Sequence, residues 1–118
     1  MLTRSALRYA AAAWTACLIF VSLHRFGNHI DSGSMTHRIS HVAAFGVLAL
    51  LLLMLGRNGA QRLLATVGAL ALAMATEFAQ YLDFRQPFEW WDVRDDGIGI
   101  LLALALVRLA RTRCTLKD

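Results

Sequence analysis

The sequence predicts an all-α membrane protein, an antiparallel bundle of four membrane-spanning helices that forms one domain over residues 1–118. Hydrophobic residues make up 58% of the chain and charged residues only 17%, against about 45–50% and about 25% in soluble domains. These apolar residues are gathered in four blocks. A chain this short cannot bury so much apolar surface in a soluble core. The same composition excludes a disordered chain.

The first predicted span covers residues 6–26 and has an uncharged core from Tyr9 to Leu23. Arg8 and Arg25 lie near its ends, where long basic side chains can reach the lipid headgroups. A cleaved signal peptide is the alternative interpretation. No small-x-small cleavage site followed by a polar domain comes after the block, so we expect a retained first helix.

The second span, 39–56, and the third, 62–82, are apolar on all sides. Residues 47–55 include no polar side chain, and residues 63–75 include only Thr66. Helices of a soluble bundle show a polar face with a period of 3.6 residues. The absence of such a face favours helices surrounded by lipid.

The fourth span, 96–110, is the shortest and needs residues from both sides to cross a bilayer. The tight connection at 57–62, with Gly56 and Gly59, predicts an antiparallel hairpin of the second and third spans. Stripes of small residues on the third and fourth spans predict close helix packing. These stripes are Ala65, Ala69 and Ala73, and Gly99 and Ala103.

Charge is divided unevenly between the two predicted membrane faces. The termini and the 57–62 connection hold eight basic residues and one acid, a net charge of +7. The other two connections and their flanks hold four basic residues, seven acids and all four histidines, a net charge of −3. Because short loops rich in Lys and Arg stay in the cytoplasm, we expect both termini there. The basic excess then reflects topology and contact with anionic lipids, and we expect no nucleic-acid partner.

Chemically capable side chains gather at the predicted outer ends of the spans. Glu77 lies five residues before the end of the third span, and an acid at such a place usually faces the bundle interior or a water-filled cavity. Gln80 and Tyr81 follow at i+3 and i+4 and share its face. His41 opens the second span on the same side, with Arg38 one turn earlier.

The connection before the fourth span adds further polar candidates. Asp92, Asp96 and Gly99 fall on one helical stripe if that helix begins early. The aromatic residues within 84–91 predict a belt at the membrane interface. Arg85 would hold a carboxylate or a phosphate.

These candidates also have structural interpretations. Glu77 would pair with Arg85, Arg38 or His41 to lock the bundle. Asp92 and Asp96 would cap the fourth helix. Three histidines would be loop residues, namely His24, His29 and His37. Because the histidine spacing fits no standard zinc pattern, we expect no metal and no cofactor, with a His/Glu/Asp metal site as the less favoured alternative.

Three short stretches follow one another along the chain. Residues 37–45 read HRISHVAAF, residues 77–80 read EFAQ with Arg85 after them, and residues 92–99 read DVRDDGIG. Together they resemble the VanZ-like family of small bacterial membrane proteins, over about residues 37–103. The chain departs from the family pattern at a few positions: His37 and Arg38 stand where Asp and Lys are usual, and Asp96 where Asn is usual.

The resemblance implies a multi-pass protein of the bacterial cytoplasmic (inner) membrane that acts on the cell envelope at its outer face. The name-giving member of the family is associated with low-level resistance to the glycopeptide teicoplanin. The partners implied are membrane lipids and a lipid-linked cell-wall precursor or glycopeptide.

Three functions follow from these residues. An envelope-binding protein would hold the phosphate or carboxylate of its ligand with Arg85 and would use Glu77 and His41 for hydrogen bonds or proton exchange. The other residues of its binding site would be Arg38, Gln80, Asp92 and Asp96. A membrane-embedded hydrolase or transferase would use Glu77 as the catalytic base and His41 as its partner, although no nucleophile motif supports this. A structural subunit would use the polar cluster only to hold helices together. The first two functions need a cavity on which His41, Glu77 and Arg85 converge, and the third predicts direct pairing.

Overall fold

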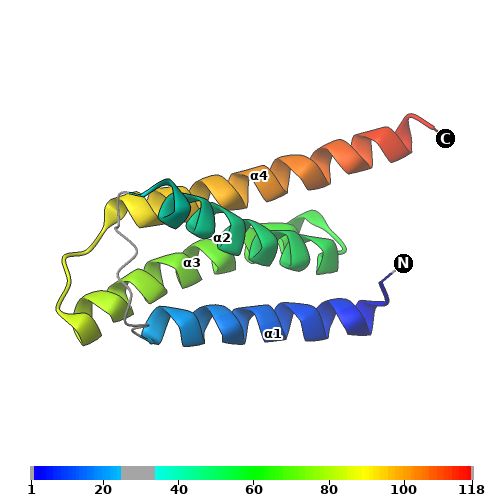
Figure 1. Ribbon diagram of the computed structural model, residues 1–118. Coiled ribbons are helices and arrows are strands. Elements are labelled where there is room, and N and C mark those ends of the chain that lie inside the picture. Colours follow the sequence, from blue (N-terminus) through cyan, green and yellow to red (C-terminus); the bar gives the residue numbers. More distant parts are fainter. Residues whose placement is uncertain (1, 25–33, 118) are drawn as a thin grey trace.

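The computed structural model describes residues 2–24 and 34–117, which form four α-helices and no strand. The helices are α1 (Arg4–Leu23), α2 (Met35–Leu55), α3 (Gly59–Phe84) and α4 (Trp90–Thr115). They lie side by side, and the two chain termini lie toward the same end of the bundle (Figure 1). The prediction of an all-α fold with four helices is confirmed.

Three helices begin at polar caps. The side chains of Thr3, Ser34 and Asn58 each accept a hydrogen bond from the backbone N–H three residues later, which satisfies an otherwise unpaired donor at the helix start. Only residues 56–58 separate α2 from α3, and these two helices form the predicted hairpin (Figure 1).

The helices extend beyond the predicted spans at their polar ends. Helix α2 begins at Met35 and not at residue 39, and α4 begins at Trp90 and not at residue 96. The described part of α1 ends at Leu23, so the last residues of the predicted first span lie outside the described ranges. The added turns matter for function, because they carry the polar side chains of the candidate site.

Helices α1, α2 and α3 are each long and apolar enough to cross a membrane. Helix α4 does not meet the same standard, because it is charged near both ends and lacks charge only over residues 97–107, a rise of about 16 Å. The hydrocarbon core of a bilayer is about 30 Å thick. Several acids near the start of α4 are nevertheless buried inside the bundle.

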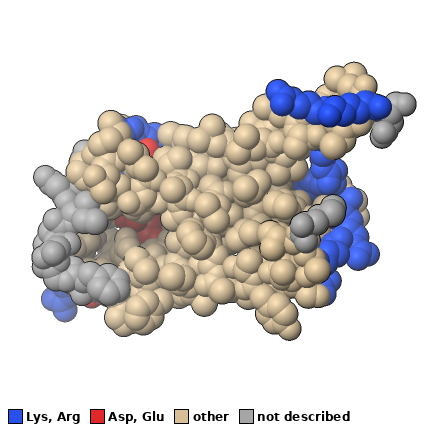
Figure 2. All heavy atoms as spheres, turned by 45° about the vertical axis from the view of Figure 1, so that its right-hand side comes forward, with Lys and Arg blue, Asp and Glu red and all other residues tan. Residues whose placement is uncertain are grey.

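Large apolar side chains are exposed on all four helices, for example Phe20, Met54, Leu64 and Leu101. Figure 2 shows a broad uncharged surface between two polar ends, with Lys and Arg gathered toward the end that carries the termini and acidic residues recessed toward the other. An exposed apolar surface of this extent is typical of a protein embedded in lipid.

The closest helix contact joins α2 and α4 at two glycines. A Cβ atom added at Gly99 would overlap the carbonyl oxygen of Val42 and lie 2.9 Å from the backbone nitrogen of Gly46. Ala103 lies one turn further along α4 and is 2% exposed. On α3, Ala69 and Ala73 are buried in the same core. The small-residue stripes therefore pack as predicted.

Candidate functional site

Two histidines of α2 face two aspartates of α4 beside this crossing. Nε2 of His37 lies 3.1 Å from both carboxylate oxygens of Asp92. His41 lies one turn later, with Nδ1 2.7 Å from Asp96 Oδ1 and Nε2 3.5 Å from Asp92 Oδ2. Each pair has i,i+4 spacing, which places both members on one face of their helix. Asp92 is 5% exposed and Asp96 2%.

The structure corrects the position predicted for His37. This histidine is a residue of α2 and not of a loop, and its ring centroid lies 4.6 Å from that of His41. His24 follows the end of α1, and His29 lies outside the described residues. The spacing His37-x-x-x-His41 was the available signal, but it becomes informative only when α2 begins before residue 37.

Asp95, which the sequence did not single out, organises two arginines. Its carboxylate accepts hydrogen bonds from Arg38 Nε at 3.3 Å and from Arg94 Nε and Nη2 at 3.1 and 2.9 Å. The carboxylate is almost fully buried, whereas the side chains of Arg38 and Arg94 are 45% and 41% exposed. The guanidinium of Arg94 also lies over the Trp91 ring, 4.7 Å from its centroid. Both arginines are therefore held in place while part of each remains accessible.

Glu77 is buried and bonds to the backbone, and it forms no ion pair with His41 or with any arginine that the structure describes. Its Oε1 accepts the N–H of Glu89, the N-cap residue of α4, at 2.8 Å. A carboxylate at this place satisfies a free donor and is favoured by the helix dipole. Glu89 is itself partly buried near Asp92, and burial together with the charge of Asp92 raises the pKa of the Glu89 carboxyl above its ordinary value.

The remaining predicted residues of α3 lie apart from this cluster. Gln80 donates from Nε2 to the backbone oxygen of Ser22 at 3.0 Å and so ties α3 to α1. Tyr81 is exposed. Arg85 is exposed in the left-handed conformation, with φ 52°, and makes no hydrogen bond or ion pair with any residue that the structure describes. None of the three pockets given below, all formed by described residues, is lined by His41, Glu77 or Arg85.

Two adjoining pockets lie beside the cluster. One, of about 520 Å³, has aromatic and charged walls that include Phe88, Trp91 and Arg94. The other, of about 380 Å³, has mainly apolar walls that include Ile39 and Ile98. Arg38 and Asp95 line both pockets. The two pockets thus share a wall formed by Arg38 and Asp95 at the end of α2 and α4, and the second is the more apolar of the two.

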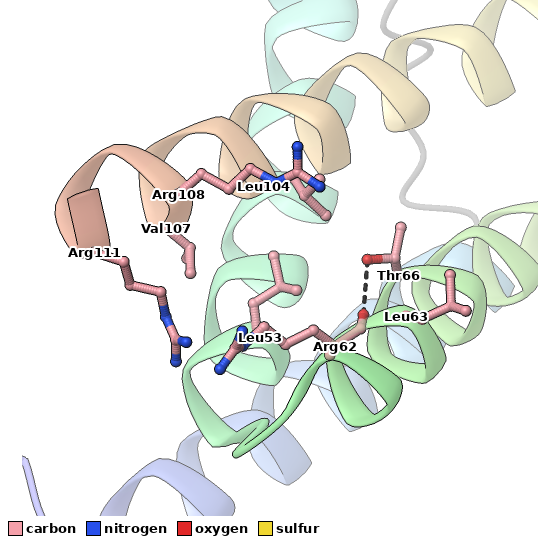
Figure 3. A pocket seen from close by; sticks show the side chains of 9 residues that line it. Leu53, Arg62, Leu63, Thr66, Leu104, Val107, Arg108 and Arg111 are labelled. Atoms are coloured by element: carbon pink, nitrogen blue, oxygen red, sulfur yellow. Dashed lines mark hydrogen bonds between the residues drawn. The ribbon is translucent and has the colours of Figure 1, made fainter. Parts of the chain in front are cut away.

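A third pocket, of about 260 Å³, lies at the opposite end of the bundle. Its apolar walls include Leu53 and Val107, and three arginines surround it: Arg62 from α3, and Arg108 and Arg111 from α4 (Figure 3). The Nε atom of Arg62 is buried without a hydrogen-bond acceptor among the described residues. These three arginines form no ion pair with a described residue, and they lie next to apolar surface.

The chain matches no family model, no curated protein and no solved structure. The resemblance to the VanZ-like family therefore rests on the three sequence stretches. In the structure these stretches lie on three helices, 37–45 on α2, 77–80 on α3 and 92–99 on α4. The first and third are in direct contact through their histidines and aspartates.

Proposed function

We propose that this chain is a VanZ-like protein of the bacterial cytoplasmic membrane that binds an anionic envelope lipid or a lipid-linked cell-wall precursor at the outer leaflet. The observation that carries the proposal is the pair of adjoining pockets. The phosphate of such a ligand would lie between Arg38 and Arg94, and its hydrocarbon chain would follow the apolar pocket toward Ile98. A soluble anion has no hydrocarbon chain that could fill the second pocket.

The hydrogen bonding of the two arginines supports an anionic ligand. One carboxylate, that of Asp95, serves two guanidinium groups, which leaves unused N–H donors on both arginines. Glu89 also lines the polar pocket and brings the formal charge of its ionisable walls to zero. Guanidinium groups bind phosphate through paired hydrogen bonds. The exposed Trp90 and Trp91 beside them suit the boundary between headgroups and hydrocarbon.

The distribution of basic residues supports the orientation in this proposal. The end that carries the termini and the pocket of Arg62, Arg108 and Arg111 would face the cytoplasm, in agreement with the positive-inside tendency. Anionic lipids of the inner leaflet would lie against these arginines. The histidines and aspartates would then lie at the outer face.

The native cysteines offer a test of this orientation. Cys17 and Cys114 are free and exposed, and Cys114 lies at the end with the termini. In a Cys17→Ser background, a membrane-impermeant maleimide is expected to label Cys114 only after cells are permeabilised. In a cysteine-free background, the Asp83→Cys variant at the opposite end is expected to react in intact cells. The reverse pattern would show that the orientation is inverted.

The lipid site predicts loss of binding when its two arginines are neutralised. The Arg38→Gln/Arg94→Gln double variant is expected to bind an added anionic phospholipid, or an undecaprenyl phosphate probe, at least 10-fold more weakly than the wild type. The physical reason is the loss of both guanidinium groups at the polar pocket. Native mass spectrometry of the detergent-purified protein with each added lipid would measure the change.

Arg85→Gln is the matched control, because Arg85 is an exposed arginine at the same end that lines neither pocket. It is expected to bind like the wild type. Equal binding by the double variant would refute the site, and loss in Arg85→Gln alone would restore the role predicted for Arg85 from the sequence. Teicoplanin susceptibility of a sensitive host that expresses the same variants tests whether lipid binding has a resistance phenotype.

A further inference from the structure

We propose that His37, His41 and Asp92 form a binding site for a divalent transition-metal ion of the Zn²⁺ class. One ligand atom from each side chain can be chosen so that all three lie within 4.8 Å of one another. The nitrogen–oxygen distances to Asp92 are 3.1 Å from His37 and 3.5 Å from His41. In a tetrahedral site with bonds of about 2.0–2.2 Å, ligand atoms lie roughly 3.3–3.6 Å apart. The two distances to Asp92 are therefore close to those of a bound ion, and the two histidine nitrogens, which lie within 4.8 Å of each other, would approach by side-chain rotation.

The hydrogen bond from His41 to Asp96 prepares the imidazole for a metal. Nδ1 of His41 lies 2.7 Å from Asp96 Oδ1. Because an ionised carboxylate can only accept a hydrogen bond, we assign the ring proton to Nδ1, which donates to Asp96. Nε2 of the neutral ring then presents its lone pair toward an oxygen of Asp92. Two such electron-rich atoms face each other favourably when a metal ion lies between them or when the ring carries a second proton, and the titration described below distinguishes these two cases. A carboxylate behind a metal-binding histidine is a common support for such sites.

The charges around the site also favour a bound cation. Asp92 and Asp96 are both buried, and neither forms an ion pair with an arginine or lysine among the described residues. The nearby Arg38 and Arg94 are paired with Asp95 instead. A divalent ion bound by two neutral histidines would balance the two carboxylates.

The ligands come from two rigid helices whose separation is set by the Gly46–Gly99 contact. This contact lies about one turn beyond the histidines on α2 and the aspartates on α4, so it fixes the distance between the two pairs. Both histidine side chains are about one-fifth exposed. Three protein ligands with access to water are the usual composition of a zinc site that keeps one position for water or substrate.

Metal titration of the purified full-length chain separates this proposal from simple protonation of the histidines. After chelator treatment in detergent, the wild type is expected to bind one Zn²⁺ per chain, measured by elemental analysis after dialysis. Co²⁺ in its place is expected to give the intense visible absorption of a four- or five-coordinate ion. His37→Ala and Asp92→Asn are each expected to weaken Zn²⁺ binding at least 100-fold. Asp96→Asn is expected to weaken it about 10–100-fold without loss of stoichiometry.

The controls are His24→Ala and Asp83→Asn, which remove the same residue types from the same end of the bundle and should leave Zn²⁺ affinity unchanged. Circular dichroism confirms that each variant is folded, and the partly exposed His37 is the substitution least coupled to folding. Zn²⁺ binding that is equal in wild type and His37→Ala, or Co²⁺ with only the weak spectrum of its hydrated ion, would overturn the proposal. The lipid variant Arg38→Gln/Arg94→Gln should bind Zn²⁺ normally, so the two proposals succeed or fail separately.

Discussion

Replacing Gly99 with alanine is expected to destabilise the bundle by about 3 kcal/mol, the upper part of the usual range for overpacking. The added Cβ would overlap the carbonyl oxygen of Val42 and come close to the backbone nitrogen of Gly46. These are backbone atoms of a neighbouring helix, so no side-chain rotation can make room. Helices α2 and α4 must move apart, and the histidines and aspartates beside the crossing move with them.

Gly97→Ala is the matched control, because Gly97 lies on the same helix and a Cβ there would have nothing within 4 Å. Alanine at this position is expected to be neutral or to stabilise the protein by up to about 1 kcal/mol through helix propensity. Thermal unfolding in one detergent, followed by circular dichroism, compares the two variants. If Gly99→Ala melts at the same temperature as Gly97→Ala, the close approach of α2 and α4 is wrong.

The sequence predicted the four helices because apolar blocks are long and loops short in a membrane protein. It placed the beginnings of α2 and α4 too late, since hydropathy detects only the stretch that faces lipid. The first turns of α2 and α4 are polar and are buried against each other. His37 and Asp95 lie in those turns, so their roles became visible only in three dimensions.

The hydrogen-bond partners of the predicted site residues could not be predicted, because they depend on where the chain runs after α3. Glu77 was expected to meet a cation or a ligand, but its acceptor atoms face the backbone of Glu89, twelve residues later. Charge patterns identify possible ion pairs and give no information about backbone donors. Likewise, nothing in the residue pattern distinguished Arg94, which lines the polar pocket, from Arg85, which does not.

The contact between His41 and Asp96 is expected to contribute a coupling free energy of about 1.5–3 kcal/mol, the usual range for a hydrogen bond to a charged group. A double-mutant cycle of His41→Ala and Asp96→Ala, measured by unfolding with chelator present, isolates this value. The two single variants should differ. His41→Ala leaves a buried carboxylate without its partner and is expected to cost about 3–5 kcal/mol.

Asp96→Ala is expected to cost less, about 2 kcal/mol, because the imidazole that remains is one-fifth exposed and can bond to water. With a coupling of about 1.5–3 kcal/mol, the double variant should cost about 3–4 kcal/mol, which is less than the sum of the two single variants. Arg94 and Asp95 provide the comparison pair, with an expected coupling of about 1 kcal/mol or less, since the Arg94 side chain is largely accessible to solvent. Equal couplings in the two cycles would mean that burial does not strengthen the histidine–aspartate contact. Because the carboxylate behind a metal-binding histidine contributes about 10–100-fold to metal affinity, such a result would also lower the Zn²⁺ affinity expected of the site.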